Sequence, residues 1–367
     1  MNSLSAANTH FAFDLFQQLK GSKKDDIFYS PLSISTALAM TYLGAKENTA
    51  FEIGEVLHFN EATENTKERT TTDHVQKLGN VHHQFQKLLT ELKKPTDAYE
   101  LNIANKLYGE KNYQFLQEYM DNVKKFYLTS VESVDFNNAA EESRKKINSW
   151  VESQTHEKIK DLFPKDSLKS AILVLVNAVY FKGQWDSKFD KKNTVDKEFW
   201  LNKDVQAKIL EIPYKGKDLS MILLLPDEVD GLQKLEDQLT AEKLIEWTSS
   251  QNMSNAHVDL YLPRFKVEKT YDLRDTLRAL GMVDVFSTQR ANLSGMSGRK
   301  NLMVSKVIHK SFVEVTEEGT EAASSSAVSV HLTSAPTYSF HCDHPFLFFI
   351  KHNETNSILF LGRVSSP

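Results

Sequence analysis

The chain has 367 residues, of which 40% are hydrophobic and 25% charged, and its formal net charge is −5. Acidic and basic residues are interspersed, which argues against a basic face for nucleic acid and against a membrane-seeking patch. The first twenty residues lack the basic start and long apolar run of a secretory signal, and no apolar stretch is long enough to span a bilayer. The only cysteine, Cys342, excludes an intramolecular disulfide and suits a reducing compartment. These features predict a soluble cytoplasmic protein and leave open its release without a cleavable signal peptide.

The first half of the chain is mainly helical in pattern. Residues 6–19 carry apolar side chains at helical spacing, and residues 26–50 predict a short strand followed by a helix from Ser30-Pro31 to about Gly44. Residues 59–80 are polar and rich in Thr and Glu, which predicts a long exposed loop. Helices are expected at 81–92, 115–127 and 143–162, and a strand at 100–109.

The second half is mainly β in pattern. Residues 171–181 form a nearly unbroken apolar run, which is typical of a strand covered on both faces. Further strands are predicted at 209–213, 219–226, 258–265, 344–350 and 358–364, with one helix at 272–280. Helices come first and strands mostly later without regular alternation, which indicates an α+β fold. No repeat or flexible linker divides the chain, so we expect a single domain over residues 1–367.

One late segment, residues 319–337, is small, polar and flexible in composition between two strongly β stretches. It is too rich in small residues to pack and too long for a turn. Loops of this length without structure of their own are usually functional.

Catalytic motifs are missing from the sequence. It contains no Gly-x-Ser-x-Gly, no Gly-x-Gly-x-x-Gly and no phosphate-binding loop. A thiol nucleophile would have to be Cys342, and no positioned base is evident near it. The residues from His341 to His344 would alternate between the faces of a strand and so do not form a zinc-ligand set. We therefore expect no enzymatic activity, no cofactor and no metal.

The string FHCDHPFLFFI, residues 340–350, resembles the serpin family signature. Five further stretches fit the same family, at residues 26–40, 147–162, 175–185, 262–268 and 313–323. By this resemblance, which covers nearly the whole chain, the sequence is identified as a member of the serpin family. It is most similar to the intracellular, ovalbumin-like branch. Within that branch, the strings ESVDF, INSWVE and HPFLFFI are similar to those of the squamous cell carcinoma antigens.

The resemblance implies a serpin fold with three β-sheets, eight or nine helices and an exposed reactive-centre loop at about residues 319–337. It implies a proteinase inhibitor that acts as a suicide substrate: the target cuts the loop, and the loop then inserts into the central sheet. The expected partner is a cathepsin-like cysteine proteinase or, second, a chymotrypsin-like serine proteinase, because Leu332 is apolar and the loop lacks Arg and Lys. The protein is expected to be a monomer. A non-inhibitory serpin that acts as a binding or chaperone-like protein is the alternative.

The resemblance also implies roles for individual residues. The reactive bond would join Thr333 to Ser334, with Leu332 just before it. The hinge of the loop would consist of Gly319, Thr320, Glu321, Ala322 and Ala323. A polar network where the sheet opens would comprise Ser30, Ser33, Asn177 and His309, and Trp185 would be the aromatic residue at the end of the sheet where insertion begins.

Two properties of the sequence bear on this mechanism. Residues 322–327 are all small, so they can enter a sheet, and a dozen new backbone hydrogen bonds at ~1 kcal/mol each would stabilise the inserted form by on the order of 10 kcal/mol. The uncut form would then be kinetically trapped. However, only residues 201–204 lie between residues 199–200 and 205–206, a passage that is usually longer in the family. Either a segment is deleted, naturally or by splicing, or residues are missing from the chain as given. A real deletion predicts unpaired strand edges, lower stability and aggregation.

Overall fold

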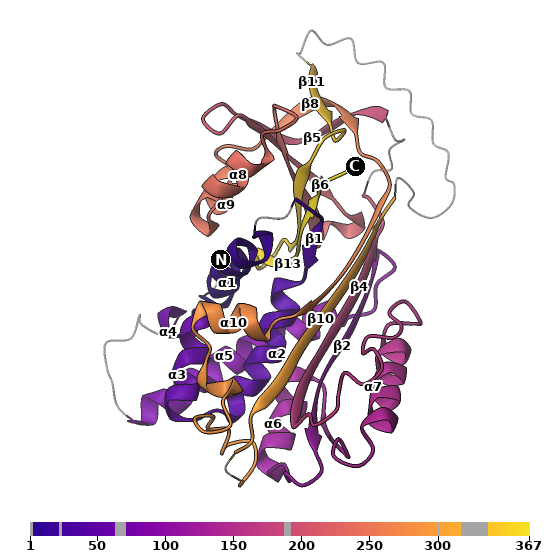
Figure 1. Ribbon diagram of the computed structural model, residues 1–367. Helices are drawn as coiled ribbons and strands as arrows, with labels where there is room; N and C mark the ends of the chain where they lie inside the picture. The colour runs from indigo at the N-terminus through magenta and orange to yellow at the C-terminus, as the bar shows by residue number, and fades with distance from the viewer. Residues whose placement is uncertain (1–2, 22–23, 63–70, 187–191, 300, 317–336) are drawn as a thin grey trace.

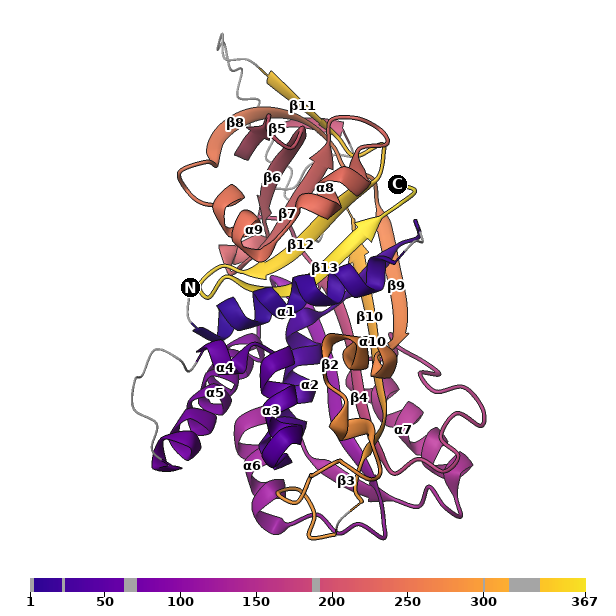
Figure 2. The same cartoon turned by 60° about the vertical axis from the view of Figure 1, so that its left-hand side comes forward.

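The computed structural model describes residues 3–21, 24–62, 71–186, 192–299, 301–316 and 337–367. A five-stranded sheet and most of the helices form one end of the molecule, and an eight-stranded sheet forms the other (Figure 1). In the turned view, α1 runs along β13, and α8 and α9 lie close to β6 and β7 (Figure 2). Among the described residues, no helix has the length and apolar character needed to cross a membrane.

The described residues contain ten α-helical segments, of which α4 is a single turn. Their bounds are α1 Ser3–Lys20, α2 Pro31–Gly44, α3 Glu47–Val56, α4 Phe59–Ala62, α5 Thr71–Leu92, α6 Gln117–Tyr127, α7 Ala140–Gln154, α8 Leu232–Gln238, α9 Ala241–Trp247 and α10 Arg274–Leu280. Short 3₁₀ turns span Lys215–Lys217 and Asp284–Phe286. The helices predicted at 6–19, after Ser30, at 81–92, at 115–127 and at 272–280 are confirmed within a few residues at each end, except that α5 begins ten residues earlier.

Two predictions for the helical half were wrong in part. The loop expected at 59–80 contains α4 and the first ten residues of α5, while residues 63–70 lie outside the described residues. Val75, Leu78 and Phe85 follow helical spacing, a signal that the polar composition around them hid. The helix expected to reach residue 162 ends at Gln154, because the Thr155 hydroxyl accepts the Ile159 N–H and the next two residues have positive φ.

The strands are β1 Ile27–Tyr29, β2 Tyr99–Glu110, β3 Val131–Val134, β4 Leu173–Gly183, β5 Lys192–Asn202, β6 Ala207–Pro213, β7 Leu219–Pro226, β8 Ser254–Tyr261, β9 Phe265–Asp272, β10 Val304–Val315, β11 Thr337–His341, β12 Phe346–His352 and β13 Ser357–Val364. The strand predicted at 258–265 is in fact the end of β8 and the start of β9, which lie in different sheets. Pro263 separates them because proline cannot donate a ladder hydrogen bond.

The five-stranded sheet has the order β3-β2-β4-β10-β9, and its strand β4 separates two cores. Alternate residues of a strand face opposite sides. The side toward the larger core, which includes α2, carries Leu173, Leu175, Asn177, Val179 and Phe181. The side toward the smaller core, beneath α7, carries Val174, Val176, Ala178 and Tyr180. Burial on both faces explains the unbroken apolar run in the sequence.

The eight-stranded sheet has the order β1-β13-β12-β7-β6-β5-β8-β11. Strand β5 pairs with β8 through residues 192–199 and with β6 through residues 198–202. The two parts of the sheet are therefore joined through one strand. The three sheets implied by the resemblance are found in the described residues as one five-stranded sheet and this continuous sheet of two parts.

A tight turn connects β5 to β6 at the passage that is short for the family. The buried Asn202 side chain accepts hydrogen bonds from Asp204 N–H at 3.1 Å and from Val205 N–H at 3.4 Å. Gln206 has a φ of 53°, and its carbonyl accepts the Asp227 N–H at 2.8 Å. The short passage thus forms a hydrogen-bonded turn.

Candidate functional site

The candidate site is the seam between β4 and β10 in the five-stranded sheet. These neighbours run parallel and pair from Leu173 with Val304 to Lys182 with Glu314. After β10 the described chain ends at Thr316 and resumes at Thr337, the first residue of β11 in the other sheet. A strand placed between two parallel neighbours can run antiparallel to both and pair with each. The seam is therefore a place where the sheet can accept one more strand, provided that β4 and β10 separate.

Buried polar side chains join the two strands at the middle of the seam. His309 on β10 is directly paired with Asn177 on β4, and His309 Nδ1 lies 2.5 Å from Asn177 Oδ1. The Asn177 side-chain amide donates to Ser33 Oγ at 2.6 Å. All three residues are at most 5% exposed, so their hydrogen bonds form away from water. Separation of β4 and β10 must break the contact between His309 and Asn177.

The start of α2 connects this network to the eight-stranded sheet. Ser30 caps the helix, because its Oγ accepts the Ser33 N–H at 3.2 Å, and Pro31 occupies the first helical position. The same hydroxyl donates to the Leu359 carbonyl of β13 at 2.6 Å, and the Ser30 N–H donates to His309 Nε2 at 3.0 Å. One cap residue therefore connects α2, β10 and β13.

The hydrogen bonds determine which nitrogen of His309 carries the proton. Nε2 accepts from the Ser30 N–H and faces the Ser311 hydroxyl at 2.5 Å, so the proton resides on Nδ1 and is donated to Asn177 Oδ1. A second ring proton, on Nε2, would point at the Ser30 N–H, which is itself a donor and cannot accept a hydrogen bond. Burial lowers the pKa of His309 to about 3, in agreement with a neutral ring at physiological pH.

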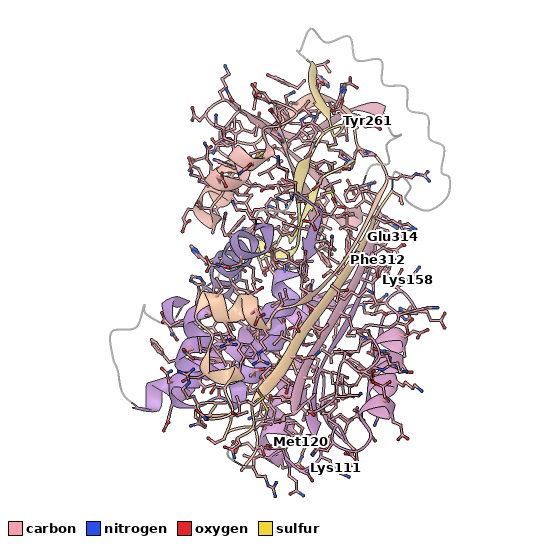
Figure 3. All side chains as sticks on the ribbon, in the orientation of Figure 1. Lys111, Met120, Lys158, Tyr261, Phe312 and Glu314 are labelled. Atoms are coloured by element: carbon pink, nitrogen blue, oxygen red, sulfur yellow. The ribbon has the colours of Figure 1, made fainter. Side chains whose placement is uncertain are left out.

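Further contacts hold β10 in place near its end. The Trp185 indole N–H donates to the Thr316 carbonyl at 2.8 Å, and its ring stacks on Tyr214 with centroids 4.4 Å apart. Two residues before Thr316, the Glu314 carboxylate lies 3.7 Å from Lys182 Nζ across the seam and 3.7 Å from Lys266 Nζ on β9. Figure 3 labels Phe312 and Glu314 along this part of β10.

A cavity of about 60 Å³ lies beside the network, between α2, α5, β2 and β4. Its wall includes Ser30, Ser33, Asn105 and Val179. This volume would hold about two waters.

The structure brings together four of the residues that sequence reasoning placed in the sheet-opening network: Ser30, Ser33, Asn177 and His309. Trp185 lies apart from them, at the end of the seam. The predicted hinge and reactive bond, namely Gly319, Thr320, Glu321, Ala322, Ala323, Leu332, Thr333 and Ser334, are outside the described residues.

Sequence reasoning missed Ser311, Tyr214 and Glu314. Ser311 follows His309 by two residues and so shares its strand face, a signal that alternation alone could have provided. Tyr214 and Glu314 have no such local signal, because their partners are distant in the chain.

The side chains of the site serve to hold two strands together rather than to catalyse a reaction. Its one histidine is neutral and enclosed, and Cys342 is also buried, which raises the pKa of its thiol far above the ordinary range. Among the described residues, no group of three His, Cys, Asp or Glu side chains could hold a metal ion. The arrangement can resist or permit the separation of two strands.

Comparison with known proteins agrees with this geometry. The family model described as "Serpin (serine protease inhibitor)" matches residues 6–367. Human Serpin B3 and Serpin B4, the squamous cell carcinoma antigens, are each 64% identical to this chain over 392 and 391 positions, with the whole of both chains covered. The structure of uncleaved ovalbumin is 38% identical, with a TM-score of 0.87 over 99% of this chain and 100% of that one. The chain therefore belongs to the serpin family.

Proposed function

We propose that the protein inhibits proteinases by suicide-substrate trapping, with insertion of its cut loop between β4 and β10. The observation that carries this proposal is the parallel pairing of β4 and β10 together with the position of the loop, which directly follows β10. Residues 319–330 number twelve, while β4 has 11 residues and β10 has 12. A strand made of this segment would match the length of the seam.

Insertion would open the seam in the order in which its contacts lie along β10. The hydrogen bond from Trp185 to Thr316 would break first, then the ion pair between Lys182 and Glu314, and the buried pair of Asn177 and His309 last. The hinge residues Gly319, Thr320, Glu321, Ala322 and Ala323 would enter as the first of these contacts opens. Each contact contributes to a barrier that keeps the uncut form from inserting.

For the target, we propose a papain-like cysteine proteinase first and a chymotrypsin-like serine proteinase second. The proposed reactive bond joins Thr333 to Ser334. Papain-like enzymes select an apolar residue one place before the residue they cut after, which Leu332 supplies, and chymotrypsin-like enzymes could cut after Leu332 itself. We further propose a monomer in the cytoplasm, a compartment in which the reduced, buried Cys342 would persist.

The second candidate function is that of a non-inhibitory binding or chaperone-like serpin. It is favoured by the length of the chain: the alignment with Serpin B3 has 392 positions and this chain 367 residues, so 25 positions have no counterpart here. We place most of them at the turn between β5 and β6. If the shorter β5–β6 passage slows loop insertion, hydrolysis of the bond between the loop and the proteinase releases the proteinase first. The protein is then a substrate of the proteinase and does not inhibit it.

Papain and chymotrypsin, each titrated for active sites, are suitable probes. An inhibitor forms a complex with one or both that survives SDS, and mass spectrometry of the released peptide identifies the cut bond. We expect cleavage after Leu332 or Thr333. Cleavage without a complex would favour the second function, and cleavage only outside residues 330–335 would contradict the proposed reactive bond.

A further inference from the structure

We propose that one face of β5, β8 and β11, called here the acidic face, is a second contact surface for the target proteinase and binds basic residues beside its active-site cleft. The acidic face consists of Asp196, Glu198, His257, Asp259, Thr337, Ser339 and His341. The proposal rests on the proposed function, because it assumes that a proteinase cuts the loop near Thr333.

The length of the chain limits how far the bound proteinase can be from this surface. Ser334 is three residues before Thr337, so the cut bond lies at most about 14 Å from the start of β11. A proteinase of ~220 residues has a radius of gyration of about 17 Å. The active-site face of the bound proteinase must therefore lie over the end of the molecule where β11 begins, whatever path the loop follows.

Strand register defines the acidic face. Asp196 on β5 is paired with His257 on β8, and His257 is paired in turn with Thr337 on β11. The opposite side of these strands carries Phe199, Val258, Leu260 and Phe340, which are all buried. By alternation, the residues of the acidic face point away from that core. The face is thus continuous with the first described residue after the loop.

The charge on this surface is predominantly negative. Asp196, Glu198 and Asp259 contribute three carboxylates, and alternation along β5 places one basic residue, Lys192, on the same side. Register places Lys192 opposite Tyr261, toward the end of β8 farther from Thr337. Asp196 is in contact with His257, and Asp259 Oδ2 lies 3.1 Å from His341 Nε2. Among the described residues, Glu198 is exposed and has no ion-pair partner.

The strand that bears the edge of this face is held in place. The Tyr338 ring stacks on Phe199 of β5 with centroids 4.7 Å apart, and Lys208 Nζ of β6 donates to the Ser339 carbonyl at 2.8 Å. Both contacts reach β11 across the sheet from strands with which it does not pair. A rigid, like-charged surface steers an oppositely charged partner without an ordering cost.

Glu198→Lys tests the proposal, with Glu118→Lys as the matched control. Glu118 is exposed in the first turn of α6, near Met120, which Figure 3 places at the opposite end of the molecule from Tyr261 on β8. Both variants change the net charge equally and keep the loop intact. The rate of complex formation is measured by stopped-flow with papain, native and with its surface lysines acetylated, at low and high ionic strength.

At low ionic strength we expect Glu198→Lys to slow association with native papain by roughly fivefold, and Glu118→Lys by less than twofold. High ionic strength or acetylation of papain should abolish the difference. Equal rates for the two variants, or a Glu198→Lys effect that persists after acetylation, would overturn the proposal. If the wild-type chain is cut without forming any complex, the proposed function fails, and this inference falls with it. If the wild type traps papain but the two variants associate with it at equal rates, only the acidic face is refuted.

Discussion

At the scale of single residues, the seam depends on a histidine that must remain neutral. His309 has a pKa of about 3 in the folded chain because it is buried, whereas an unfolded histidine has a pKa near 6.5. Below about pH 6.5 the unfolded chain therefore takes up a proton that the native chain does not. His309 thus stabilises the native state in full above this pH, and its contribution is lost as the pH falls from about 6.5 toward 3.

This linkage predicts the behaviour of His309→Gln. The variant should be less stable than wild type at neutral pH, by about 1 to 3 kcal/mol, since partners of His309 lose buried hydrogen bonds. Its free energy of unfolding should also fall less steeply, by roughly 1 kcal/mol per pH unit, between about pH 6.5 and 5. Urea unfolding at several pH values measures both. Burial also lowers the pKa of His82 to about 3, so His82 should contribute to the slope in both proteins in the same way. Identical slopes for wild type and His309→Gln would contradict the role of His309.

Trp185→Phe isolates one hydrogen bond at the end of the seam. Phenylalanine can keep the stack on Tyr214 but cannot donate to the Thr316 carbonyl. We expect a loss of about 1 kcal/mol in the free energy of unfolding and faster insertion of an added loop peptide. Peptide insertion can be followed by native gel mobility. Tyr214→Phe is the control, because it retains the indole N–H and the ring; equal insertion rates for both variants would show that the bond does not restrain the seam.

At the scale of elements, β5 carries two pairings that lie in different parts of one sheet. Each pairing covers only part of the strand, so some of the β5 backbone groups lack a neighbouring strand on one side. Replacing residues 201–204 by the corresponding longer passage of human Serpin B3 should therefore raise the melting temperature by several degrees and reduce aggregation on heating. Scanning calorimetry and light scattering measure the two effects. An unchanged or lower melting temperature would show that the tight turn is no weakness.

Substitutions in the hinge test which of its side chains face the core when the loop inserts. If insertion starts at the hinge, Thr320 turns toward the core and its neighbour Glu321 turns away. Thr320→Arg would then place an unpaired charge in the sheet at the first step, and a barrier higher by ~3 kcal/mol slows insertion roughly a hundredfold. We expect this variant to be cut and released by papain without a complex. Glu321→Arg, which adds the same charge on the other face, should still form the complex; if Thr320→Arg traps as well as wild type does, the account of the hinge is wrong.

The elements that the sequence predicted well are those with a strong local pattern. The buried β4 was evident from its apolar run, and α2 from the cap at Ser30 followed by Pro31. The divided pairing of β5 and the separation of β8 from β9 depend on contacts between distant segments, so periodicity could not reveal them. The residues of the polar network were predicted from the family resemblance, but their geometry was not, because Ser30 and His309 are far apart in the chain and meet only when β10 packs over the start of α2.

At the scale of the whole molecule, the proposed insertion of the cut loop requires the uncut protein to be the less stable form. The seam is closed by a few identifiable contacts, and a dozen new residues in the sheet would contribute on the order of 10 kcal/mol. That gain is comparable with the entire stability of an ordinary domain. Under the proposed mechanism, the closed seam therefore persists only while the loop is joined to the protein at both ends.

The proposed mechanism requires β4 and β10 to part and accept the cut loop. The most direct test is thermal unfolding of the protein before and after its loop is cut by a proteinase that it does not trap, with the cut position checked by mass spectrometry. We expect the cut form to melt far above the uncut form, because the inserted strand replaces the single ladder of hydrogen bonds between β4 and β10 with two. A melting temperature that stays the same or falls after cleavage within the loop would contradict insertion and the function built on it.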